Sequence, residues 1–116
     1  MDVDRFEKGP KSDLALLHLE IPKELDKYAK VADGHQYHDG EEADFYGFGK
    51  GFKDEDVDWL QMARMKVIAQ RDNINAGEVT TMHGITGSSN HGDSSGPVFT
   101  KDGELIAIDV MGSRFV

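Results

Sequence analysis

The sequence contains no cysteine, so it can form neither disulfide bridges nor thiolate metal sites. It also lacks any run of about 18 apolar residues, and its first twelve residues carry no apolar core, so we expect neither a membrane span nor a signal peptide in this stretch. Basic residues are scarce: 13 lysines and arginines face 22 acidic residues, giving a formal net charge of −9. Because nucleic acids bind to clustered cations, we expect no nucleic-acid partner and no membrane partner.

What is present indicates one domain built from short strands. The 116 residues suffice for one modest hydrophobic core and are too few for two ordinary domains. Glycine, with 13 residues concentrated after Gly34, favours tight turns between strands. We expect strands at residues 13–21, 42–48, 77–85, 97–100 and 104–111, with the KDG at 101–103 as a hairpin turn, since Asp-Gly accepts positive φ.

Two stretches suit a strand less well. Residues 22–31, PKELDKYAKV, place a proline at a first helical position ahead of good helix formers, so we expect a short helix there. Residues 59–70 are ambiguous, because Leu, Met, Ala and Gln favour a helix whereas Val67 and Ile68 favour a strand.

A histidine-rich stretch, HQYHDGEE at 35–42, raises the question of a metal site. Its candidate ligands are His35, His38, Asp39, Glu41 and Glu42, and imidazole with carboxylate can hold zinc. The spacing is not that of a known helical zinc site, and a polar loop explains it equally well. An acidic metal-binding domain therefore stays a lesser alternative, and we assign no metal and no cofactor.

The stretch HGDSSGPVF at 91–99 is the best candidate for chemistry. A nucleophilic serine needs an exposed hydroxyl on a sharp turn, backbone N–H groups aimed at the developing oxyanion, and a neighbouring base. Gly, Ser and Pro supply such a turn, although an ordinary turn has the same composition. GFGKGF at 47–52 lacks the endings of phosphate-binding loops, so we interpret it as a glycine-rich strand exit.

The order of four segments resembles one protein family. GDSSGPVF followed by a hairpin and ELIAIDVMGS resembles the nucleophile region of the chymotrypsin-like (trypsin family) serine endopeptidases, whose motif is GDSGGP. Upstream, DLALLHL resembles the segment that carries the catalytic aspartate, GEEADFYGFG resembles a strand ending in GWG, and WLQMARMKVIA resembles the strand that follows it. The resemblance implies an all-β fold, a chymotrypsin-like antiparallel β-barrel, mainly the second of two barrels and incomplete at both ends.

The resemblance also implies a domain organisation. Residues 1–116 would be a single partial protease domain, in which residues 1–33 are the end of the first barrel and a linker and residues 34–116 are the second barrel. Chain length agrees with this, because two barrels of this class usually need about 200–250 residues.

Catalytic roles follow from the resemblance residue by residue. Ser94 would be the nucleophile, the backbone N–H groups of Gly92 and Ser94 would form the oxyanion hole, and Asp13 would orient the catalytic histidine. Asp93 matches the aspartate that pairs with a new N-terminal amine in activated relatives. The departure is Ser95, which stands where the family has glycine, so a positive φ there would make the turn more costly.

The resemblance also implies substrate-binding residues. They are Ser88, Asp109, Val110 and Gly112. Trypsin-type enzymes carry aspartate at the position of Ser88, so their rule for Lys and Arg does not transfer directly. Alternation along the last strand places Asp109 on the same face as Ala107 and Met111. The resemblance implies that this face is the pocket wall, where a carboxylate would favour a basic side chain.

The general base of the family does not occur at its expected place. Only twelve residues precede Asp13, none of them histidine, and neither His18 nor His91 matches the motif. The resemblance therefore implies a secreted serine endopeptidase that cleaves protein or peptide substrates through an acyl-enzyme. Its histidine would come from a missing N-terminal segment or a partner chain, and this chain alone should be inactive. The alternative is a non-catalytic, protease-like binding module.

Overall fold

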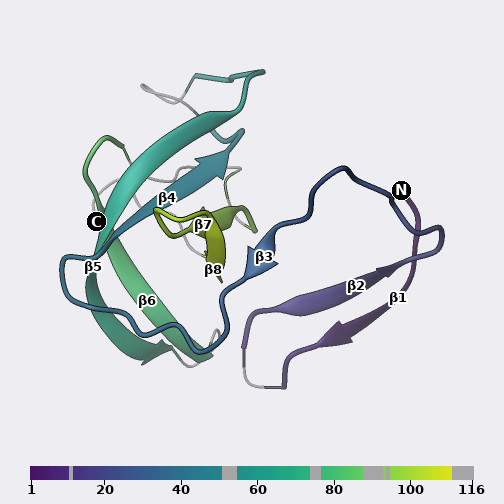
Figure 1. Ribbon diagram of the computed structural model, residues 1–116, viewed down its shortest axis with the longest axis horizontal. Coiled ribbons are helices and arrows are strands. Elements are labelled where there is room, and N and C mark those ends of the chain that lie inside the picture. The colour runs from purple at the N-terminus through teal and green to yellow at the C-terminus, as the bar shows by residue number, and fades with distance from the viewer. Residues whose placement is uncertain (11, 51–54, 74–76, 88–92, 94, 111–116) are drawn as a thin grey trace. The chain divides into compact units, whose positions relative to one another are not determined.

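All regular elements of the computed structural model are β-strands (Figure 1). It describes residues 1–10, 12–50, 55–73, 77–87, 93 and 95–110. The strands are β1 (Val3–Lys8), β2 (Ala15–Leu19), β3 (Lys30–Val31), β4 (Glu42–Gly47), β5 (Gln61–Asn73), β6 (Gly77–Gly84), β7 (Pro97–Phe99) and β8 (Glu104–Ile108). No helix occurs in these ranges, and hence none that could cross a membrane. The all-β prediction is confirmed.

The chain divides into two units. One comprises Met1–Tyr28 with Gln70–Val79, and the other Ala29–Ala69 with Thr80–Val116. In the first unit, β1 and β2 form an antiparallel ribbon with Phe6 opposite Leu17. The sequence did not predict β1, because VDRFEK has too few apolar residues to alternate clearly. The predicted boundary between residues 33 and 34 stays a prediction.

A six-stranded sheet in the order β3-β8-β7-β4-β5-β6 belongs mainly to the second unit, and the parts of β5 and β6 within Gln70–Val79 belong to the first. β4 is antiparallel to both β5 and β7, β7 is antiparallel to β8, and the short β3 runs parallel to β8. Within the described residues, β3 and β6 are the edges and the sheet does not close on itself.

One face of this sheet carries the core. Alternation along β4 buries Ala43 and Phe45, which pack with Met65 from β5 and Val98 from β7. Phe45 lies opposite both Ala63 and Val98, so β4 is flanked by apolar side chains on each side. The ambiguous segment at 59–70 is resolved by this pairing, because β5 follows β4 in register from Gln61 to Lys66.

The helix expected at 22–31 is wrong. Residues 22–29 have no regular structure and the segment ends in β3. The Tyr28 hydroxyl replaces helical hydrogen bonds: it accepts from the Leu25 N–H at 3.0 Å and donates to the Lys23 carbonyl at 3.1 Å. Pairing of Val31 with Leu105 then favours extended backbone.

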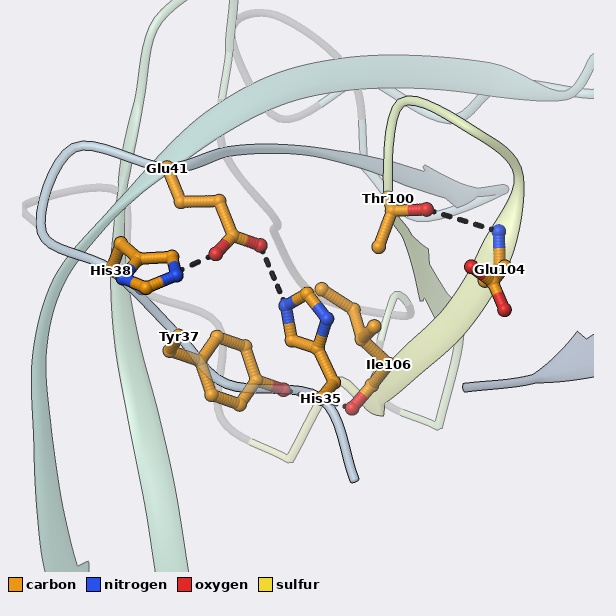
Figure 2. A network of polar contacts seen from close by, with 7 residues as sticks. All are labelled: His35, Tyr37, His38, Glu41, Thr100, Glu104 and Ile106. Atoms are coloured by element: carbon orange, nitrogen blue, oxygen red, sulfur yellow. Dashed lines mark hydrogen bonds and ion pairs between the residues drawn. The ribbon is translucent and has the colours of Figure 1, made fainter. Parts of the chain in front are cut away.

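The hairpin turn predicted at 101–103 is confirmed. Gly103 has φ +86° and its N–H donates to the Thr100 carbonyl at 3.0 Å. The Thr100 hydroxyl also accepts from the Glu104 N–H at 3.1 Å (Figure 2). These contacts fix the β7–β8 hairpin that follows the GDSSGP motif.

Candidate active site

The Asp93 carboxylate lies where β4 ends. Asp93 is only 8% exposed, and its Oδ1 accepts from the Gly49 N–H at 2.8 Å. A buried carboxylate needs such donors because it has left water. Asp93 and Gly49 are 44 residues apart, so this bond joins the GDSSGP motif to the GFG strand exit.

Gly47 and Gly49 leave the space that this carboxylate occupies. A Cβ at Gly49 would lie within 2.6 Å of both Asp93 carboxylate oxygens, and a Cβ at Gly47 would overlap Oδ1. The interpretation of GFGKGF as a strand exit is correct, because β4 ends at Gly47. The contact with Asp93 was not predicted, because it joins segments 44 residues apart.

The backbone after the proposed nucleophile adopts a strained conformation. Ser95 has φ +72°, the one positive φ among the described non-glycine residues. The Gly96 N–H donates to the Asp93 carbonyl at 3.0 Å, so Ser95 stands at the third position of a four-residue turn, where positive φ favours glycine. A Cβ at Gly96 would lie 2.9 Å from the Tyr46 carbonyl oxygen, so this glycine packs closely on β4. The cost anticipated for Ser95 is therefore present.

The residue that follows β8, Asp109, forms backbone hydrogen bonds with the same turn. The Ser95 N–H donates to the Asp109 carbonyl at 2.7 Å, and the Asp109 N–H donates to the Gly96 carbonyl at 2.9 Å. Asp109 is half-buried, and one of its carboxylate oxygens is shielded from solvent. The backbone thus places Asp109 directly beside the turn, next to the half-buried Val110.

An open groove of about 720 Å³ begins at this turn and runs over the face of the sheet opposite the core. Asp93 and Ser95 line one part of it, and apolar side chains line much of the rest, namely Tyr46, Phe48, Leu60, Pro97 and Phe99. The Tyr46 and Phe99 rings meet edge to face with centroids 5.8 Å apart. Phe48 and Leu60 are more than half exposed, so the groove presents apolar surface to solvent.

Two ion pairs involve residues that line this groove, Asp44 and Lys101. Arg64 Nε lies 3.0 Å from Asp44 Oδ1, and the hydrogen bond together with the negative charge of Asp44 raises the pKa of Arg64. Lys101 Nζ lies 2.5 Å from Glu42 Oε2. The hydrogen bond from Lys101, and then its positive charge, lower the pKa of Glu42.

The histidine-rich loop is occupied by its own hydrogen bonds (Figure 2). His35 Nε2 lies 2.7 Å from Glu41 Oε2, and the other Glu41 oxygen accepts from the His38 N–H at 3.2 Å. The Tyr37 hydroxyl donates to the Ile106 carbonyl at 2.8 Å and ties the loop to β8. The ranges that the structure describes contain no group of three or more His, Asp or Glu side chains placed to hold a metal.

The structure describes only some of the remaining predicted residues. Asp13 is exposed and lies two residues before the start of β2, in the first unit. His18 lies on β2 with Nδ1 2.7 Å from Asp4 Oδ1. Four residues of the predicted site lie outside the described residues: Ser88, Gly92, Ser94 and Gly112, together with His91.

Comparison with known proteins identifies a family. The family model described as Trypsin matches residues 2–115. Neither the comparison with curated proteins nor the comparison with solved structures gave a match.

Proposed function

Since the chain belongs to the trypsin family, with its chymotrypsin-like β-barrel fold, we propose that it is the Asp- and Ser-bearing portion of a serine endopeptidase. The family itself indicates serine protease-like function in general. One observation supports the finer assignment to this site. Asp93 and Ser95, the neighbours of Ser94 in the sequence, are both anchored, one by the Gly49 N–H and the other by Asp109.

The proposed chemistry divides peptide hydrolysis into two steps. Ser94 Oγ attacks the substrate carbonyl while its proton passes to a histidine, and the N–H groups of Gly92 and Ser94 stabilise the oxyanion. The histidine returns the proton to the leaving amine, and an acyl-enzyme remains. Water, deprotonated by the same histidine, then releases the acid and regenerates Ser94. Asp13 orients the histidine and stabilises its protonated form.

The histidine in this proposal comes from outside the sequence, from a further segment or a partner chain. His18 does not match the family's motif for this histidine, because it follows Asp13 in the chain whereas the family's histidine precedes the aspartate. Without a base Ser94 is only an alcohol, so the 116-residue chain alone should be unreactive. Family members are commonly secreted, and we extend the proposal to secretion, which fractionation of the producing cells and their medium would test.

The experiment that tests the nucleophile is labelling with a fluorophosphonate probe. The protein expressed from its complete coding sequence should be labelled, and Ser94→Ala should abolish labelling. Ser95→Ala is the matched control, because it removes the neighbouring hydroxyl and keeps the Cβ. Labelling that survives Ser94→Ala would refute the assignment of Ser94.

Substrate binding belongs to the same proposal. Ser88, Asp109, Val110 and Gly112 would line the pocket for the side chain before the cleaved bond. The position of Asp109 beside Ser95 and Gly96 supports a preference for Lys or Arg, since a carboxylate at the wall would attract a cation. Asp109→Asn should lower kcat/KM for basic substrates at least about tenfold and leave apolar substrates nearly unchanged. Equal loss for both classes would refute this role.

The second candidate function is a non-catalytic binding module that retains the barrel. The strained Ser95 favours it, because a side chain at this position costs stability in the turn that must present the nucleophile. A folded full-length protein that the fluorophosphonate never labels, and that still binds peptides, would replace the endopeptidase by this function.

A further inference from the structure

The dipeptide Asp-Gly occurs three times in the sequence, at residues 33–34, 39–40 and 102–103. At such a bond the backbone nitrogen of the glycine can attack the Cγ atom of the aspartate side chain, because a five-membered ring results. Glycine permits this attack best, since it has no Cβ to shield its own nitrogen. Each of the three bonds is therefore a candidate site of spontaneous chemical modification.

The reaction converts aspartate to isoaspartate without any cofactor. A bond forms between the glycine nitrogen and Cγ, the bond from Cγ to the hydroxyl of the neutral carboxyl breaks, and the hydroxyl leaves as water with the amide proton. Water then opens this cyclic succinimide at one of its two carbonyl carbons. Attack at Cγ restores aspartate, whereas attack at the main-chain carbonyl carbon leaves the nitrogen bonded to Cγ and gives isoaspartate. The water lost in the first step is regained in the second, and nothing is oxidised or reduced.

Exposure and backbone conformation do not distinguish the three bonds. All three aspartates and all three glycines are exposed. Gly34, Gly40 and Gly103 have positive φ, of +68°, +81° and +86°. Apart from their chain neighbours, no atom of the described residues lies within 4 Å of the position that a Cβ would take at any of them. A difference in reactivity must therefore come from another contact.

The hydrogen bonds of the glycine N–H groups do distinguish the three bonds. The Gly40 N–H donates to the Val67 carbonyl on β5 at 2.8 Å, and the Gly103 N–H donates to the Thr100 carbonyl at 3.0 Å. A nitrogen engaged in this way must leave its acceptor before it can attack a side chain, and this local opening costs free energy. Within the part of the chain that the structure describes, the Gly34 N–H has no such acceptor.

The aspartate of the first bond is also unrestrained. Among the described residues, no hydrogen bond or ion pair holds the Asp33 carboxylate. On one side of the bond the Ala32 N–H donates to the Leu105 carbonyl at 2.9 Å, and on the other side the His35 ring is engaged with a carboxylate. The two residues of the bond lie between these contacts and take part in neither, so their backbone and side-chain torsions are free to close the ring.

We propose that the bond between Asp33 and Gly34 is a site of spontaneous isoaspartate formation, whereas the fold protects the other two Asp-Gly bonds. The modified residue adds one carbon atom to the backbone between Ala32 and Tyr37, which are both hydrogen-bonded to β8 carbonyls. The chain is therefore lengthened where β3 leads into the histidine-rich loop, while its mass and net charge stay the same.

Incubation of the folded 116-residue chain at mildly acidic pH tests this proposal, because a larger share of exposed carboxyls is then neutral. Isoaspartate is quantified by methyl transfer from labelled S-adenosylmethionine with isoaspartyl methyltransferase, and it is located by electron-transfer fragmentation of proteolytic peptides in a mass spectrometer. A cooperative unfolding transition in urea verifies that the chain stays folded. Isoaspartate should accumulate at Asp33 at least about fivefold faster than at Asp39 or Asp102, since only the latter two require a bonded N–H to be freed.

The same chain unfolded in urea shows the intrinsic reactivity of each bond. There the three rates should agree within about threefold, because the protecting hydrogen bonds are gone. In the folded chain, Asp33→Glu should remove most of the methyl incorporation, since the longer side chain would have to close a six-membered ring, which forms more slowly. Asp39→Glu is the matched control and should leave the incorporation nearly unchanged.

Three outcomes would overturn the proposal. One is an equal rate at the three bonds in the folded chain, and another is isoaspartate that appears at Asp39 or Asp102 before Asp33. The third is a folded chain that stays unmodified at Asp33 while the unfolded chain reacts there, because the fold would then protect this bond as well.

Discussion

Replacing Ser95 by glycine should stabilise the folded chain. Ser95 is held at φ +72° by hydrogen bonds of its own N–H and of the Gly96 N–H. An L-residue in the left-handed region costs about 1–2 kcal/mol, which glycine does not incur. Glycine loses about 0.5–1 kcal/mol of this gain because it has more backbone freedom in the unfolded chain. The net expectation is a rise of about 0.5–1 kcal/mol in the free energy of unfolding.

Equilibrium unfolding in urea measures this change. With an m-value of about 2 kcal/mol/M, the midpoint should move upward by about 0.3–0.5 M while the m-value stays constant. Ser95→Ala provides the control, because it removes the hydroxyl but keeps the Cβ that conflicts with positive φ. Its midpoint should stay close to that of the wild type. If Ser95→Ala stabilises as much as Ser95→Gly, the gain comes from losing the hydroxyl and the argument from φ is refuted.

Three further changes test the contacts around the turn and the sheet. Gly49→Ala should cost about 2–4 kcal/mol in urea unfolding, because its Cβ displaces the buried Asp93 carboxylate from its N–H donor. Tyr37→Phe should cost about 1 kcal/mol in the same assay, since the hydroxyl donates to a β8 carbonyl. Lys101→Met should lower the melting temperature at pH 7, and the difference from the wild type should shrink as the pH falls. The lowered pKa of Glu42 means that its ion pair stabilises above the unfolded pKa and is lost as pH falls through the folded one.

Control variants separate these specific effects from a general loss of stability. Gly34 has φ +68°, and no atom lies within 4 Å of the position that a Cβ would take there. Gly34→Ala should therefore cost only the backbone contribution of about 1 kcal/mol, clearly less than Gly49→Ala. Glu42→Gln should imitate Lys101→Met in its loss of pH dependence. A melting-temperature difference for Lys101→Met that does not shrink as the pH falls would exclude the ion pair as its cause.

Local patterns in the sequence sufficed for most strands. Alternation identified β4 and β8, and Asp-Gly identified the turn between β7 and β8. The helix at 22–31 failed because helix propensity is weak and here Tyr28 satisfies backbone groups that a helix would pair. β1 was missed because its pairing with β2, and not its own composition, makes it a strand.

In the candidate site, the sequence indicated the conformation of Ser95 but not the contacts of Asp93. The family's glycine at the position of Ser95 indicated that positive φ could matter, and the structure has it. The position of the Asp93 carboxylate beside Gly47 and Gly49 could not be predicted from the sequence, since it depends on a contact between segments 44 residues apart. No local property of GFG distinguishes a strand exit from a space reserved for a distant carboxylate.

The bond between Gly49 and Asp93 also bears on the order of folding. Closing a loop of this length costs entropy before any contact within it is gained. The turn that presents the proposed nucleophile therefore depends on this distant contact as well as on its local bond between Gly96 and Asp93. It is complete only when β4 has paired with β7. We expect this turn to be among the last features to form, so that Gly49→Ala accelerates unfolding and leaves the refolding rate nearly unchanged.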